Sequence, residues 1–185
     1  MRAGRSFHPS PFAVTGSTVA RMTHATKDEL DRIGTLIHKA RTALLTTVDE
    51  HGRLVSRPMV VQEREFDGDL WLFTEDPSHK TAEVRANPEV NVALESGKGW
   101  LSLSGTAEVV RDPAKVDELW STSAQAWFEQ GRDDPSVALL KVTAHSAEYW
   151  TSEEPRPVVL LRYARAAARG GHPHVGQSHT VDLEG

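Results

Sequence analysis

The run of residues 72–80 holds the side chains best suited to chemistry in this sequence. A strand-like stretch ends in the hydroxyl of Thr74, a short loop follows, and a helix starts at Ser78, His79 and Lys80. Free N–H groups and the dipole at a helix N-terminus attract anions, and Lys80 adds a full positive charge. This chemistry suits a phosphate monoester. A capped surface helix with a solvated lysine explains the same residues, and the run taken alone favours that simpler interpretation.

Arg57 is the second candidate, because it directly precedes Pro58 in a strand-like stretch from residue 54 to residue 63. Proline donates no hydrogen bond to a sheet, so this strand lies at an edge or carries a bulge. Backbone groups left unpaired there could hydrogen-bond the edge of a flat heterocycle. An edge-strand arginine that pairs with Glu63 or Asp69 is an equally good explanation.

The aromatic and histidine residues give weaker signals. Of the five tryptophans, Trp71 and Trp150 fit inward strand positions, so we expect them to pack in the core. Trp100 follows a glycine turn, where its ring could stack on a ligand, but packing in the core or in a dimer is favoured. The nine histidines include a group near the C-terminus without the spacing of a metal site, so no metal is expected.

The sequence contains no cysteine and lacks the motifs of several catalytic classes. Disulfide frameworks, thiolate zinc sites and cysteine nucleophiles are therefore excluded. There is no GxSxG elbow, no GxxxxGK[ST] loop and no GxGxxG run after a strand. Any redox chemistry must come from a bound cofactor.

The composition is that of an ordinary globular protein. Of 185 residues, 38% are hydrophobic and 25% charged, which argues against disorder and against a membrane protein. A net charge of -5 argues against nucleic acid as the main partner. The first twenty residues do not resemble a signal peptide, so we expect a cytoplasmic protein. Residues 1–25 are expected to form a flexible extension, with Met22 just before the first helix.

The elements that would position these residues follow from hydrophobic periodicity and turn signals. Helices are predicted after the capping-box sequence at Thr26, after Ser78 and after Asp112-Pro113. Six strands are predicted, at residues 43–48, 54–63, 70–74, 90–94, 100–110 and 137–150, and a further helix at 158–168. Short turns between strands favour an antiparallel, mainly β (α+β) fold over a Rossmann fold.

Several motifs, in order along the chain, together resemble those of one family. They are residues 56–59 (Ser-Arg-Pro-Met), 66–68, 70–74, 78–80, Asn87-Pro88, 104–107, Asp112, Trp120, Trp127-Phe128, Gly131, Asp133-Asp134-Pro135, 148–150 and 181–183. Their order and spacing resemble the pyridoxamine 5'-phosphate oxidase-like FMN-binding split barrels, and most closely the general stress protein branch. The resemblance implies a six-stranded antiparallel split β-barrel with flanking helices at residues 26–155, followed by a C-terminal helix and tail at 156–185. It also implies a homodimer with FMN at the interface.

The same resemblance implies which residues contact the cofactor. The strand from Arg57 to Gln62 would line the isoalloxazine ring, with Arg57 also reaching the phosphate. Phe73 and Thr74 would lie beside the ribityl chain and phosphate, and Trp100 would contact the flavin. The full set is Arg57, Pro58, Met59, Val60, Gln62, Phe73, Thr74, Ser78, His79, Lys80 and Trp100.

Three of these positions depart from the family's oxidases, and the departures bear on activity. Gln62 replaces a lysine, His79 an arginine and Trp100 a glutamine. Fewer cations around a dianionic phosphate weaken FMN binding, and pyridoxamine-phosphate oxidation is not expected. The sequence therefore predicts a flavin-dependent oxidoreductase of the general stress protein type without an assigned catalytic residue. A non-catalytic flavin store or sensor, or a protein that binds FAD or a deazaflavin, remains an alternative.

Overall fold

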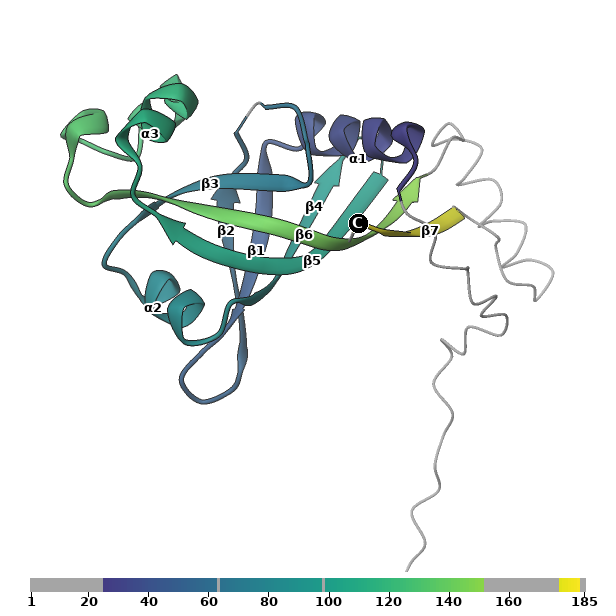
Figure 1. The fold of residues 1–185 in the computed structure, drawn as a ribbon, viewed down its shortest axis with the longest axis horizontal. Coiled ribbons are helices and arrows are strands. Elements are labelled where there is room, and N and C mark those ends of the chain that lie inside the picture. Colours follow the sequence, from purple (N-terminus) through teal and green to yellow (C-terminus); the bar gives the residue numbers. More distant parts are fainter. Residues whose placement is uncertain (1–24, 63, 98, 152–176, 184–185) are drawn as a thin grey trace, which may run out of the picture.

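A curved antiparallel sheet organises the chain in the computed structural model, which describes residues 25–62, 64–97, 99–151 and 177–183. The strands are β1 (Thr42–Val48), β2 (Leu54–Val60), β3 (Asp69–Glu75), β4 (Glu89–Ser96), β5 (Gly99–Val110), β6 (Val137–Thr151) and β7 (Gln177–Asp182). The helices are α1 (Lys27–Lys39), α2 (His79–Ala86), α3 (Pro113–Leu119) and α4 (Thr122–Gln125), with a 3-10 helix at Gly131–Asp133. The strand order is β2-β1-β4-β5-β6-β3, with β7 added beside β6 (Figure 1).

Local sequence signals account for the helix starts. Thr26 caps α1: the Glu29 amide donates to its side chain, and its own backbone N–H donates to a Glu29 carboxylate oxygen at 2.8 Å. Asp112 caps α3 by accepting from the Ala114 amide at 2.9 Å, with Pro113 in the first turn. These are the positions predicted from the sequence, because a capping residue acts only on the next turn of the chain.

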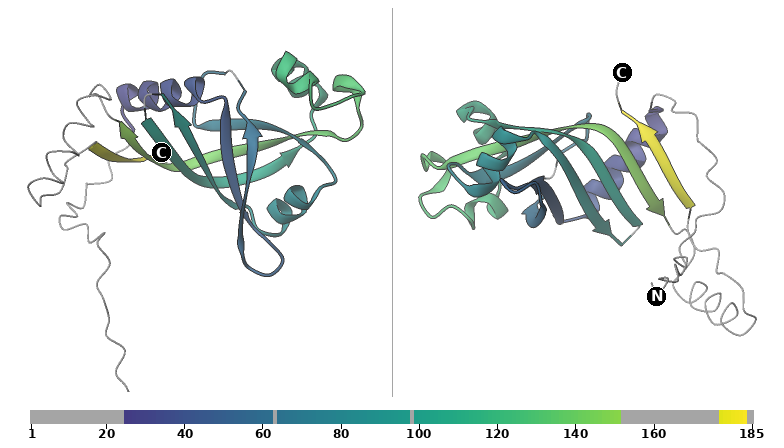
Figure 2. Two further views of the ribbon diagram at one scale, coloured as in Figure 1. Left: turned by 180° about the vertical axis from the view of Figure 1, so that it is seen from behind. Right: turned by 90° about the horizontal axis from the view of Figure 1, so that it is seen from below.

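The hydrophobic residues form two clusters on the two sides of β3. The larger cluster fills the barrel and includes the fully buried Ile33 of α1 and Leu72 of β3. The smaller one lies beneath α3 and contains Leu119, Phe128 and Leu139, with Phe73 and Trp120 packed against it. Successive β3 residues point to opposite faces of the sheet, so β3 joins the barrel core to this outer cluster. Figures 1 and 2 show α3 at the end of the sheet remote from β7.

The seventh strand is the main difference from the predicted six-stranded barrel. β7 pairs with β6 from Thr151↔Gln177 to Ser146↔Asp182, and the Ala25 amide donates to the Asp182 carbonyl at 3.1 Å. Of its side chains, Val181 is almost completely buried, at 1% exposure. A single buried apolar residue in a polar run gives too little alternation to predict a strand.

Two tryptophans expected in the core lie elsewhere. Trp150 is 37% exposed, because the neighbouring Tyr149 takes the inward position on β6. Trp71 packs against the outer cluster, where the Lys115 ammonium lies 5.0 Å from its ring centroid. The helix predicted at 158–168 and the extension before Ala25 lie outside the described residues.

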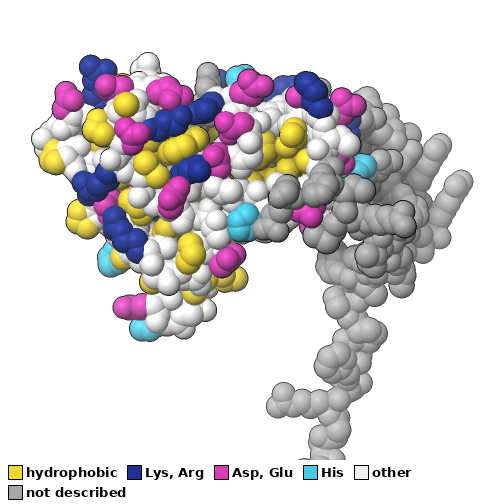
Figure 3. All heavy atoms as spheres, in the orientation of Figure 1, with side chains coloured by type: hydrophobic (Ala, Val, Ile, Leu, Met, Phe, Trp, Pro, Cys, Tyr) yellow, Lys and Arg dark blue, Asp and Glu magenta, His cyan; other side chains and the backbone are white. Residues whose placement is uncertain are grey.

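The surface carries charged side chains of both signs with apolar side chains between them (Figure 3). Among the described helices, none has the length and apolar character needed to cross a membrane.

Candidate functional site

A cavity of about 460 Å³ opens between β2, β3, the start of α2 and the segment after α3. We call it the β2–β3 cavity. Seven of the eleven residues predicted to contact a cofactor line it: Pro58, Met59, Val60, Gln62, Phe73, Thr74 and Lys80. The remaining lining residues are Thr42, Glu75, Ala124, Trp127 and Phe128. Two strands and a helix that are separate in sequence therefore place most of the predicted residues around one space.

The cavity has mainly apolar walls and a single lysine. Pro58, Met59, Val60 and Phe73 supply apolar surface from the two strands. Burial lowers the pKa of Lys80, and the nearby Arg57 also lowers it, whereas the carboxylates of Glu75 and Glu83 oppose this shift. A partly desolvated ammonium gains more from an anionic ligand than a solvated one does.

Ser78 and His79 lie beside the cavity but do not line it. Ser78 is the N-cap of α2. The Ser78 backbone N–H donates to the Thr81 hydroxyl at 2.9 Å, and the Thr81 backbone N–H donates to the Ser78 hydroxyl at 3.4 Å. The Ser78 hydroxyl therefore already takes part in the helix cap. His79 is exposed to solvent.

Arg57 is held by a carboxylate that the sequence did not suggest. Its guanidinium donates to the Thr47 hydroxyl and, at 2.8 Å, to the Glu83 carboxylate on α2. Glu63 lies outside the described residues, and the Asp69 carboxylate pairs with Lys141 and accepts a hydrogen bond from Thr143 rather than from Arg57. The alternative explanation in which Arg57 pairs with Asp69 is therefore wrong. A partner 26 residues along the chain depends on how α2 packs, which local sequence does not reveal.

A buried aspartate fixes the loop between β3 and α2. Asp76 accepts two hydrogen bonds from Arg85, both at 2.7 Å, and one from the Arg111 Nε at 2.9 Å. Its backbone N–H donates to the Ser136 carbonyl at 2.8 Å. Hydrogen bonds from Arg85 hold the pKa of the Asp76 carboxyl well below its usual range. The loop between β3 and α2 is thus tied to α2, to the residue that follows β5 and to the residue that precedes β6.

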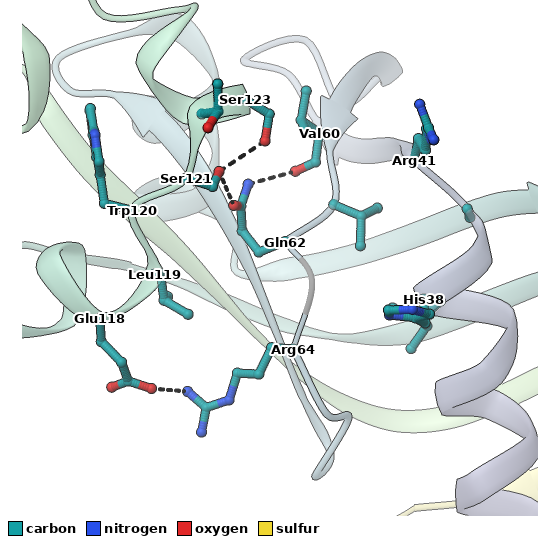
Figure 4. Close-up of a pocket in the computed structure, with 14 residues that line it drawn as sticks. His38, Arg41, Val60, Gln62, Arg64, Glu118, Leu119, Trp120, Ser121 and Ser123 are labelled. Atoms are coloured by element: carbon teal, nitrogen blue, oxygen red, sulfur yellow. Dashed lines mark hydrogen bonds and ion pairs between the residues drawn. The ribbon is translucent and has the colours of Figure 1, made fainter.

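A second cavity of about 680 Å³ adjoins the first and shares Val60 and Gln62 with it. We call it the adjoining cavity. Ser121 donates to the Gln62 amide oxygen at 3.2 Å, and its hydroxyl lies 2.9 Å from that of Ser123 (Figure 4). Gln62 lines both cavities. The other polar residues that line the adjoining cavity are His38, Arg41, Arg64, Glu118 and Thr122.

Comparison with known proteins identifies the family. The family model described as "Pyridoxamine 5'-phosphate oxidase like" matches residues 28–174. The chain belongs to this family. The resemblance noted from the sequence motifs and the split-barrel fold are both confirmed.

Members of the pyridoxamine 5'-phosphate oxidase-like family with similar sequences include general stress proteins. General stress protein 26 of Bacillus subtilis is 27% identical over 96 residues, which are 49% of this chain and 68% of that protein. Protein bli-3 of Neurospora crassa is 29% identical over 133 residues, 65% of this chain; the match spans 64% of the length of bli-3, just under two thirds. A solved structure, the general stress FMN/FAD binding protein of Xanthomonas citri, is 32% identical with a TM-score of 0.61, over 70% of this chain and 93% of that chain.

Trp100, also predicted as a cofactor contact, does not line the β2–β3 cavity. It is 55% exposed and lines a different hollow, together with Leu44 and Trp150. These three residues come from β1, β5 and β6. Within one chain, Trp100 therefore does not join the β2–β3 cavity.

The predicted set of cofactor contacts did not include the residues that complete the site. Ala124, Trp127 and Phe128 close the β2–β3 cavity from the segment after α3, and Glu83 pairs with Arg57. Trp127 is 70% exposed in the structure, which is unusual for so large an apolar side chain. In the sequence, the pair Trp127-Phe128 belongs to the motifs that carry the family resemblance, and that was the signal that could have pointed to them.

Proposed function

We propose that this chain binds FMN in the β2–β3 cavity and acts as a flavin-dependent oxidoreductase of the general stress protein type. The observation that carries the proposal is that residues from β2, β3 and α2 line one apolar cavity with a lysine among its walls. Its volume of about 460 Å³ is within the range typical of cofactor sites. The FMN/FAD binding relative from Xanthomonas citri supports a flavin as the ligand.

The residues present fit the chemical parts of FMN. Pro58, Met59 and Val60 lie on β2, which ends the strand order, so the outer edge of β2 has no strand paired to it within the described sheet. Unpaired backbone groups on such an edge can hydrogen-bond the polar rim of a flat ring. Lys80 supplies a charge for a phosphate, and the Thr74 hydroxyl lies in the same cavity. When bound, the flavin would supply hydride or electron transfer.

The adjoining cavity gives a reactant access to the ring. Because it shares Val60 and Gln62 with the β2–β3 cavity, a molecule held there would face the end of β2 where the ring would lie. Gln62 is held by Ser121 and by its own bond to the Val60 carbonyl at 3.4 Å, so its side chain is positioned between cofactor and reactant.

A non-catalytic flavin store or sensor is the second candidate. The ionisable side chains that line the β2–β3 cavity are Glu75 and Lys80, and neither is an evident acid or base for a substrate. This observation fits a protein that holds a flavin without turnover equally well. FAD or a deazaflavin in place of FMN would keep the site and change the chemistry.

Absorption spectroscopy of the purified protein, followed by mass spectrometry of the molecule released on heating, tests the proposal. FMN absorbance and mass are expected, and reduction by a nicotinamide donor with an electron acceptor would then separate an oxidoreductase from a store. Release of FAD or a deazaflavin would identify that molecule, and not FMN, as the cofactor. A colourless protein that takes up no added flavin would refute the proposal.

We also propose that the protein is a homodimer. Leu44, Trp100 and Trp150 are 48%, 55% and 37% exposed and line one shallow hollow across β1, β5 and β6. Large apolar side chains gathered on one face favour contact with another surface. A second copy of the chain is the partner that the family resemblance implies.

A further inference from the structure

Helix α2 brings a carboxylate against Arg57, which does not itself line the β2–β3 cavity but whose charge acts on Lys80 in its wall. Glu83 Oε2 lies 2.8 Å from the Arg57 guanidinium and accepts a hydrogen bond from the Thr47 hydroxyl at 2.6 Å. Arg57 and Glu83 are 20% and 15% exposed in their side chains, and Thr47 is fully buried. The three residues form one closed triangle, because Arg57 also donates to Thr47.

The charges around Lys80 balance before any ligand arrives. Arg57 and Lys80 contribute two positive charges, and Glu75 and Glu83 contribute two negative charges that act on Lys80. A phosphate monoester carries close to two negative charges near pH 7. A ligand phosphate would therefore enter a site whose cations are already compensated, and it would meet repulsion from Glu83 as well as attraction from Lys80.

We propose that Glu83 is a specificity-determining residue that limits how strongly the site prefers FMN over riboflavin. This inference rests on the proposed flavin binding. Glu83 keeps Arg57 in place through a short hydrogen bond and at the same time cancels its charge. The two flavins share the same ring and differ by the phosphate, so Glu83 affects FMN and leaves riboflavin binding nearly unchanged.

The substitution Glu83→Gln separates the two effects of this carboxylate. Glutamine retains an oxygen that can accept from Arg57 and Thr47, so the triangle can persist, but the negative charge is removed. The site would then carry one more net positive charge towards the phosphate. We expect FMN to bind about tenfold more tightly to the variant, while riboflavin affinity changes less than about twofold.

The experiment titrates wild-type protein and the Glu83→Gln variant, both freed of co-purified flavin, with FMN and with riboflavin. Flavin fluorescence reports binding, and the titrations are repeated at several salt concentrations. The variant's FMN affinity should also fall more steeply with salt than that of the wild type, because a charged contact is screened. Glu89→Gln removes the same charge from an exposed position on β4 and serves as the control.

The outcomes distinguish this inference from the proposed function. Wild-type protein that binds both flavins, with an FMN affinity unchanged or weakened by Glu83→Gln, would refute the role of Glu83 alone. Equal tightening for FMN and riboflavin would refute it too, because the effect would not involve the phosphate. Wild-type protein that binds neither flavin would refute the proposed function and this inference with it. Thermal unfolding of the variant confirms that it is folded.

Discussion

Replacing Asp76 by asparagine should destabilise the protein measurably. The Asp76 side chain is 4% exposed and accepts three hydrogen bonds from two guanidinium groups. Charge-assisted hydrogen bonds contribute about 1.5–3 kcal/mol each when buried. Arg85 and Arg111 are 52% and 50% exposed, so water can replace many of the hydrogen bonds that they lose in the variant. Asparagine also keeps one acceptor oxygen. We therefore expect the free energy of unfolding to fall by about 2–3 kcal/mol in total.

Urea unfolding at several pH values tests this expectation. The folded-state pKa of Asp76 is depressed, chiefly by Arg85, so its stabilisation is present above the unfolded-state pKa of about 3.9 and is lost as pH falls through the folded-state pKa. The difference between wild type and Asp76→Asn should be constant between about pH 5 and pH 8 and shrink below about pH 4.

Asp31→Asn is the matched control, because Asp31 is 61% exposed and pairs with the exposed Lys27. No measurable change is expected there. A loss at Asp76 below about 0.5 kcal/mol, or a difference that stays constant down to about pH 2, would contradict the reasoning.

Three further substitutions test the site, the sheet and the proposed dimer. Lys80→Ala should weaken FMN binding by about tenfold or more and riboflavin binding much less, because a charged contact to the phosphate is lost. Flavin titration measures both affinities, and equal losses for the two flavins would contradict this role of Lys80. Gly105→Ala should lower the free energy of unfolding by about 1–3 kcal/mol, because its Cβ would lie 2.1 Å from the Thr143 carbonyl oxygen, whereas Gly97→Ala, with open space around it, should change little in urea unfolding. Trp100→Asp should convert a dimer into monomers in sedimentation experiments; a dimer that persists would place the interface elsewhere.

The elements predicted correctly are those specified by neighbouring residues. Helix starts at Thr26, Ser78 and Asp112 follow from caps that act within one turn, and the structure has all three. The strand predicted at 100–110 is β5, in which the register with β6 shifts between Ser104 and Gly105. Strand β7 was not predicted, because its place depends on β6 offering an edge rather than on its own polar sequence.

The candidate site shows the same division between local and distant information. The residues on β2, on β3 and at the start of α2 were predicted as a set, and seven of them line the β2–β3 cavity. That set came from family motifs, since Lys80 by itself was better explained as a solvated residue. The wall formed by Trp127 and Phe128 and the pairing of Arg57 with Glu83 arise from tertiary packing between segments far apart in sequence. A single sequence carries no signal for the pairing of Arg57 with Glu83.

Two carboxylates that face arginines near α2 have different consequences for function. Asp76 is buried, accepts from Arg85 and Arg111, and ties the loop before α2 to the sheet, so its loss should act on folding. The charge of Glu83 acts on Lys80, and Glu83 pairs with Arg57, so removing this charge should act on ligand binding. If both substitutions changed stability equally and left flavin affinity unchanged, α2 would be a structural helix only. A stability loss confined to Asp76→Asn and an affinity change confined to Glu83→Gln would instead mean that this short helix carries both an anchor and a selectivity element.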